Sequence, residues 1–138
     1  VVLVPVSPPF SGAAAQSLLR RLNLGAGAEI HFAYAMVIPR SLPVGAPLPE
    51  EEARAEASLA AAELAIPAGV KSRHVLRARN MPEAITSAIT RLGAAEVIAG
   101  MDPNYLGDES VTAMINTLRS RCPCPLTITQ DHAPTPAA

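Results

Sequence analysis

Short apolar segments alternate with amphipathic ones along the whole chain, and this alternation restricts the fold more than any other feature. Residues 1–6 are an apolar, β-branched run typical of a strand buried on both faces. Residues 28–38 carry large apolar side chains at every second position, as a strand does. Residues 50–65 begin with three glutamates and continue with alanine and leucine, which favours a helix. The expected strands span residues 1–6, 28–38, 70–78, 95–99 and 126–129, and the expected helices residues 12–22, 50–65, 82–92 and 110–121.

Alternating strands and helices predict an α/β fold with a parallel sheet, helices on both of its faces and right-handed crossovers. The strand at residues 70–78 has more polar positions than the others and is expected near an edge. Pro5 is expected near the end of the first strand, because proline donates no ladder hydrogen bond. Ser11 and Asn80 are the expected N-caps of the helices that follow them.

Length and composition favour a single domain. The chain has 138 residues, of which 49% are apolar and only 3% aromatic, so we expect an aliphatic core. A net charge of −1 gives no electrostatic reason to expect a nucleic-acid partner. No apolar run is long enough to span a membrane and no signal peptide is recognisable, so direct membrane insertion is not expected.

The two ends of the sequence carry separate expectations. We assign the domain to residues 1–129 and expect residues 130–138, which are polar and rich in proline, to be a disordered tail. The sequence opens on an apolar strand without an initiator methionine. Processing, trimming and excision from a longer protein all explain this start, and we favour excision.

Cys122 and Cys124 are separated by a single proline. Strand-like geometry sends their Cβ atoms to opposite faces, so a disulfide between them would be strained. No histidine pattern accompanies them to complete a zinc site. We interpret them as small residues that lead into the edge of the core, in a chain that suits a reducing cytoplasm.

The strand expected at residues 95–99 ends at Gly100, and the polar side chains of Asp102 and Asn104 follow. Ligands of open parallel sheets bind in the crevice beyond the carboxyl ends of the strands. Asp102 is therefore the acid most expected to contact a ligand. The loop at residues 39–49 lies beyond another strand end, where loops often carry function.

Arg77 and Arg79, at the end of the third expected strand, are placed to reach the same crevice. The alternative, which we favour, is a solvated strand end paired with Glu83. Elsewhere, the acidic run at residues 50–52 is interpreted as first-turn helix charge rather than a metal site.

His31 and His74 are interpreted as ordinary, partly buried histidines, and His132 falls in the tail. No serine or cysteine has a recognisable base, and no metal-binding signature occurs. An enzyme is therefore not expected.

Four segments, in their order and spacing, resemble the universal stress protein family. They are Val2-Leu3-Val4-Pro5-Val6, Asn80-Met81-Pro82-Glu83-Ala84-Ile85, Glu96-Val97-Ile98-Ala99-Gly100 and Cys122-Pro123-Cys124-Pro125-Leu126. The resemblance covers nearly all of residues 1–128. It implies a Rossmann-like, adenine nucleotide alpha hydrolase-like sheet of five parallel strands in the order 3-2-1-4-5. It also implies a homodimer formed through the last strand, at Pro125, Leu126, Thr127 and Ile128.

Members of this family divide into ATP-binding and non-binding proteins, and the sequence departs from the binding pattern. Ser7 stands where nucleotide-binding members usually have an aspartate just after the first strand. Gly100 matches the first glycine of their phosphate loop, but Pro103 replaces the second and the loop is shorter. Asp108 and Glu109 lead into the last helix where glycine and serine would be expected. These acids would satisfy the helix N-terminus themselves and repel a phosphate.

The resemblance and its departures imply a cytoplasmic regulatory domain, dimeric, whose degenerate crevice is unlikely to hold ATP in the usual way. Family domains also occur fused to transporters, so a fused or associated membrane transporter is the partner considered. The alternative is a module that binds AMP, ATP or a cyclic dinucleotide through an altered phosphate loop, with the backbone near Val37 and Ile38 meeting the adenine. A slow phosphatase or ATPase that depends on Asp102 is a third hypothesis. The candidate ligand-contacting residues are Ser7, Pro8, Val37, Ile38, Arg77, Arg79, Gly100, Met101, Asp102, Asn104 and Ser110.

Overall fold

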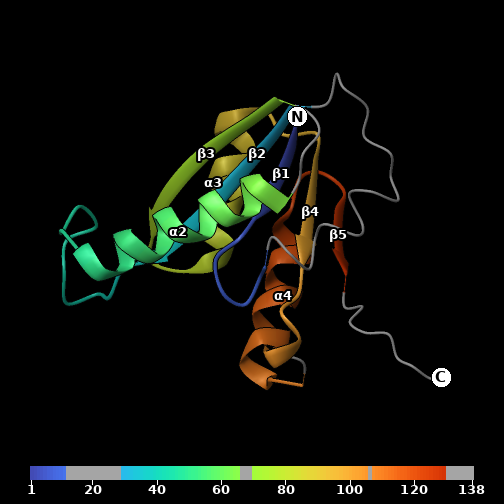
Figure 1. Cartoon of the computed structure of the whole chain (residues 1–138). Coiled ribbons are helices and arrows are strands. Elements are labelled where there is room, and N and C mark those ends of the chain that lie inside the picture. Colours follow the sequence, from blue (N-terminus) through green and yellow to red (C-terminus); the bar gives the residue numbers. More distant parts are fainter. Residues whose placement is uncertain (12–28, 66–69, 106, 130–138) are drawn as a thin grey trace.

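The computed structural model describes residues 1–11, 29–65, 70–105 and 107–129, which form a parallel sheet covered by helices (Figure 1). The strands are β1 (Val2–Pro5), β2 (Glu29–Val37), β3 (Val70–Ala78), β4 (Glu96–Gly100) and β5 (Leu126–Thr129). The described helices are α2 (Pro49–Ala65), α3 (Met81–Leu92) and α4 (Glu109–Arg121), with a short 3-10 turn η1 (Pro103–Tyr105). The strand order is β3-β2-β1-β4-β5, and the pairs are parallel, which confirms the expected order and class.

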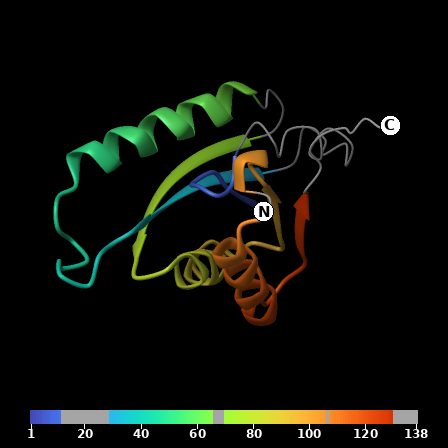
Figure 2. The ribbon, with the colours of Figure 1, turned by 90° about the horizontal axis from the view of Figure 1, so that it is seen from below.

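Helices cover both faces of the sheet, as Figure 2 shows, with α2 on one side and α3 and α4 on the other. On the α2 face, Phe32 of β2 packs in the same buried cluster as Leu59 of α2. On the opposite face, Ala35 of β2 shares a cluster with Ile85 of α3 and Leu118 of α4. The alternation of apolar side chains along β2 therefore divides them between two cores, as a strand buried on both faces requires.

Local signals in the sequence set the ends of several elements. Pro5 is the last residue of β1, and β3 is an edge strand, both as expected. Asn80 caps α3, because its side chain accepts a hydrogen bond from the backbone N–H of Glu83 at 2.9 Å. Gly93 ends α3 in the left-handed conformation, with φ +67°, which glycine adopts without strain. The expected helix at residues 12–22 and the expected tail at residues 130–138 lie outside the described residues.

The expectation that Cys122 and Cys124 point to opposite faces is wrong. Their Sγ atoms lie 3.9 Å apart, and both side chains are half-buried against the same core cluster. The physical reason is that Cys122 ends α4, where its N–H still donates to Leu118 O at 2.9 Å, and β5 begins only at Leu126. The segment between them is a turn, so the alternation of an extended strand does not apply.

No helix within the described ranges has both the length and the apolar character that crossing a membrane requires.

Candidate functional site

The carboxyl ends of β1 and β4 are joined by the segment that follows β1. Ser11 N donates to Gly100 O at 2.8 Å, and Asp102 N donates to Pro9 O at 2.9 Å. Phe10 pairs with Met101 in an isolated antiparallel bridge. These bonds place the residues after β1 against those after β4, so the structure brings the predicted Ser7–Pro8 segment and the predicted residues Gly100 to Asp102 to one edge of the sheet.

Ser7 faces the protein interior. Its side chain is buried, and its hydroxyl oxygen accepts a hydrogen bond from Ala35 N at 3.1 Å. The hydroxyl in turn lies 3.9 Å from the Met81 sulfur, to which it donates. Ser7 thus ties the end of β1 to β2 and to the start of α3, with no charge to offer a ligand. Pro8, its neighbour, is exposed.

Asp102 organises the turn after β4. Its Oδ1 accepts from the backbone N–H of Asn104 at 2.9 Å, and its carbonyl accepts from Tyr105 N at 3.0 Å. This arrangement is an Asx turn that leads into η1. Asp102 is half-buried and Asn104 is exposed.

Asp108 occupies the N-terminus of α4. Its Oδ1 accepts from Ser110 N at 2.9 Å, from Val111 N at 3.2 Å and from the Ser110 hydroxyl at 2.7 Å. The Ser110 hydroxyl, together with the N–H of Val111, holds the pKa of the Asp108 carboxyl below its usual value. Among the donors that a helix N-terminus offers an anion, these two N–H groups are therefore already bound to a carboxylate of the same chain.

Arg77 and Arg79 hold the loop that follows β2. Arg77 donates to Ala46 O at 2.7 Å and pairs with Glu52 at 3.0 Å, instead of the expected Glu83. Arg79 donates to Pro39 O at 2.5 Å and to Leu42 O at 2.8 Å. The two arginines thereby add hydrogen bonds to the carbonyl oxygens of this loop, of which Pro39 O also accepts from Leu42 N at 3.0 Å.

The end of β2 presents one exposed side chain and one buried one. Val37 is 49% exposed, whereas Ile38 is buried on the α2 face. The backbone of Ile38 is engaged, because its N–H donates to Ala78 O at 2.8 Å and its carbonyl accepts from Arg79 at 3.3 Å.

A hydrogen-bonded network that the sequence does not predict joins β2 and α2. The hydroxyl of Tyr34 donates to Glu51 at 2.8 Å, and Arg54 donates to the other oxygen of Glu51 at 2.7 Å. Burial, with the hydrogen bond and the charge of Glu51, raises the pKa of Tyr34 to about 12. The only sequence signals were a hydroxyl on the apolar face of β2 and the i, i+3 spacing of the two α2 residues.

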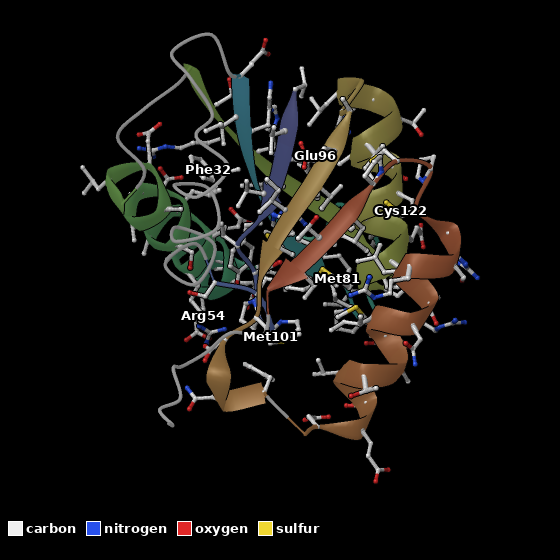
Figure 3. The ribbon with its side chains drawn as sticks, turned by 90° about the vertical axis from the view of Figure 1, so that its right-hand side faces the viewer. Phe32, Arg54, Met81, Glu96, Met101 and Cys122 are labelled. Atoms are coloured by element: carbon white, nitrogen blue, oxygen red, sulfur yellow. The ribbon has the colours of Figure 1, made fainter. Side chains whose placement is uncertain are left out.

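This network borders a groove of about 440 Å³. Its lining comes from the loop after β2 and the first turns of α2, namely Pro39, Leu48, Pro49, Glu50, Glu51 and Arg54. Figure 3 shows Arg54 toward the same end of the molecule as Met101, away from Glu96 at the other end of β4. Within the described ranges, no group of three or more His, Cys, Asp or Glu side chains is arranged to hold a metal ion.

The residues expected at a dimer interface form the outer edge of the sheet. Strand β5 pairs only with β4 in the described sheet, and Val97 N donates to Pro125 O at 3.0 Å. Pro125 and Thr127 are exposed, while Leu126 and Ile128 are half-buried against the core.

Comparison with known proteins identifies the family. The model of the universal stress protein family matches residues 1–130. A universal stress protein from Archaeoglobus fulgidus, solved in complex with dAMP, is similar with a TM-score of 0.65 and 13% identity, covering 92% of this chain and 94% of that one. A family protein from Arabidopsis thaliana with AMP bound gives 0.57 and 13%, covering 98% and 97%. A family protein from Burkholderia pseudomallei gives 0.60 and 14%, covering 94% and 96%.

None of the curated proteins matches the sequence. The family model nevertheless covers nearly the whole chain, and the solved structures share its fold over nearly their whole length. The chain belongs to the universal stress protein family.

Proposed function

We propose that this chain is a regulatory domain whose crevice does not accept the polyphosphate tail of ATP. The observation that supports this most is the carboxylate of Asp108 on the N–H groups of Ser110 and Val111 at the start of α4. A phosphate that takes this seat has to displace a bound anion and approach the next acid, Glu109. Both effects oppose binding, because like charges repel and the displaced carboxylate loses its donors.

The basic residues near the crevice support the same proposal. The guanidinium groups of Arg77 and Arg79 bond to the carbonyl oxygens of the loop after β2 and to Glu52. A ligand phosphate that recruits either arginine has to break these bonds and release the loop. Ser7 adds no charge, because a serine hydroxyl is neutral, and its oxygen is buried and accepts a hydrogen bond from Ala35 N.

A second candidate function is binding of an adenine nucleotide that carries a single phosphate. Two similar structures hold AMP and dAMP, which have no triphosphate tail to seat at α4. In this chain, the groove beside α2 offers apolar surface from Leu48 and the prolines next to one cation, Arg54, and two carboxylates, Glu50 and Glu51. A cyclic dinucleotide, which carries two phosphodiester groups but no triphosphate tail, is the larger ligand considered.

Thermal unfolding with a panel of nucleotides separates the two candidates. A ligand that binds only the folded chain raises its melting temperature by mass action. Stabilisation by AMP, cyclic AMP or a cyclic dinucleotide, without an effect of ATP and magnesium, supports the second candidate. No shift with any of these nucleotides favours a domain that works without an adenine ligand, and a shift with ATP contradicts the leading proposal.

A dimer formed through β5 completes the proposal. Among the described strands β5 has only β4 as a neighbour, and its Thr127 side chain is exposed, so we expect a second copy to pair with the outer edge of β5. We expect Thr127→Arg to place like charges across the two-fold axis and to yield monomers in sedimentation. Thr117→Arg, at an exposed position of α4, is the matched control and leaves the dimer intact. A wild-type monomer at micromolar concentration contradicts this part.

We propose that this domain regulates a partner rather than catalysing a reaction. It acts in the cytoplasm, and the proposed partner is a membrane transporter. Asp102 is the acid on which the hypothesis of a phosphatase or ATPase depends. Its carboxylate accepts a hydrogen bond from the backbone N–H of Asn104. Incubation with ATP or AMP should therefore give no hydrolysis, and a hydrolysis that Asp102→Ala removes would establish an enzyme instead. The sequence of the whole gene product tests the proposed partner. Membrane-spanning segments joined to this domain support a fused transporter, and their absence removes the fused form of the proposal.

A further inference from the structure

Three titratable side chains form a hydrogen-bonded chain at the amino end of β2 and on the neighbouring part of β3. Glu29 Oε2 lies 2.6 Å from His31 Nε2, and His31 Nδ1 lies 2.7 Å from His74 Nε2. His31 is 8% exposed and His74 is half-buried. These groups lie at the opposite end of β2 from Val37, so they are separate from the site described above.

The two imidazole rings meet edge to edge. Their centroids are 5.0 Å apart and their planes differ by 21°. The 5.0 Å between the centroids equals the 2.7 Å between the nitrogens plus about one ring radius on each side. The two nitrogens therefore lie nearly on the line that joins the ring centres. Each nitrogen therefore points at the other in the plane of its ring, which is the geometry of an N–H···N hydrogen bond.

Charged neighbours surround the pair unequally. Glu29 supplies the negative charge from β2, and Arg91 of α3 lies close enough to disfavour a positive charge on His74. Leu3, which stands beside His31 in the β1–β2 register, is apolar and fully buried. Arg73 of β3 belongs to the opposite side of the strand, where it pairs with Glu56 and Glu63 of α2.

We propose that Glu29, His31 and His74 form a pH-responsive relay that binds one proton as the pH falls and disfavours a second proton. In the neutral state, Nε2–H of His31 donates to Glu29, and Nε2–H of His74 donates to the bare Nδ1 of His31. A proton that arrives at Nδ1 of His74 lets the Nε2 proton of His74 pass to Nδ1 of His31. His31 then carries the charge beside Glu29, and His74 is neutral again with its proton on Nδ1.

The geometry favours a proton over a metal ion. A zinc ion needs about 2.0–2.1 Å to each imidazole nitrogen, and in the line between two nitrogens 2.7 Å apart there is no room for it. The carboxylate also lies on the far side of His31 rather than near the meeting point of the rings.

A second proton is opposed by the first. Two imidazolium rings at this distance repel one another, and Arg91 adds to the repulsion. Burial, the neighbouring His31 and Arg91 lower the pKa of His74 below its usual value. A lowered pKa means that the unfolded chain binds this proton more readily, so the stability that neutral His74 contributes is present above about pH 6.5 and is lost as the pH falls through its folded value.

The test is nitrogen-15 NMR of the histidine side chains over pH 4.5–9, with His132→Gln to assign the third histidine. At high pH, we expect both His31 and His74 as Nε2–H tautomers. Through the first step, His31 becomes an imidazolium and His74 changes from Nε2–H to Nδ1–H at the same midpoint. Independent curves, or a first proton that stays on His74, overturn the relay.

Two variants make the test specific. Glu29→Gln removes the counter-charge beside His31 and should lower the midpoint of the first step. Glu96→Gln is the matched control, because Glu96 begins β4 as Glu29 begins β2 and the charge lost is the same. His74→Gln, whose amide can bond to His31 but cannot take up a proton, should lose less stability than the wild type below about pH 6.5. An unchanged midpoint in Glu29→Gln, or equal acid sensitivity in His74→Gln, contradicts the proposal.

Discussion

Asp108 Oδ1 accepts a hydrogen bond from Ser110 N at 2.9 Å, so the first turn of α4 binds a carboxylate of its own chain. The same oxygen accepts from the Ser110 hydroxyl, and Glu109 adds a second acid in this turn. A helix N-terminus attracts anions through unpaired N–H groups and its partial positive charge. Here both attractions act on the protein itself, which makes α4 a capped helix and supports the proposal that its N-terminus does not bind a phosphate.

Asp108→Asn tests the cap through its pH dependence. The pKa of Asp108 is lowered in the folded chain, so its stabilising effect is present above the unfolded value of about 3.9 and is lost as the pH falls through the folded value. Asparagine also caps helices but carries no charge. At pH 7 the variant should melt below the wild type, and the gap should close in acid. A gap that stays constant from pH 7 to pH 3 would mean that charge contributes nothing. Glu109→Gln is the control for a general loss of charge.

Tyr34→Phe tests the network with Glu51. Loss of the hydroxyl removes the hydrogen bond at 2.8 Å and should destabilise the chain by about 0.5–1.5 kcal/mol, measured by urea unfolding. The raised pKa of Tyr34 means that the stability of its protonated form is present below about pH 10 and is lost as the pH rises toward about 12. In a spectrophotometric titration, the variant should lack the late part of the tyrosine ionisation. An identical late titration in both proteins would refute the assignment.

Arg79→Ala tests how the loop after β2 is held. Arg79 donates to Pro39 O and Leu42 O, so its loss removes both of these hydrogen bonds and loosens the loop. Limited proteolysis should then cut residues 39–46 faster, with little change in the melting temperature. Arg119→Ala, at an exposed position of α4, is the control. Equal cleavage of the wild type and Arg79→Ala would show that the arginine does not brace the loop.

Cys124 should be a slow nucleophile. Burial and the neighbouring Cys122 raise the pKa of the Cys124 thiol to about 11, and the thiolate is the reactive form. Alkylation by iodoacetamide at pH 8, followed by peptide mass spectrometry, should modify Cys124 at least about tenfold more slowly in the folded chain than in urea. A similar rate in both conditions would contradict the buried environment.

Most of the fold can be predicted from the sequence. Alternation along β2 predicts that Phe32 and Tyr34 share one face, and the position of Asn80 before a helical pattern predicts its role as a cap; the structure confirms both. The strand order came from the family resemblance rather than from periodicity, because hydrophobic pattern does not say which strands are neighbours.

The missed features depend on register and on turns. His31 and His74 meet because β2 and β3 pair with Ala33 opposite His74, which places the two rings diagonally. No single-strand pattern contains that register. Similarly, the close approach of Cys122 and Cys124 depends on the end of α4, which removes the strand geometry assumed for them.

The central claim is tested most directly by calorimetric titration of the wild-type chain with ATP in the presence of magnesium. Because Asp108 holds the N–H groups of Ser110 and Val111, we expect no saturable heat of binding with ATP up to millimolar concentration. Micromolar binding of ATP that depends on magnesium would contradict the account.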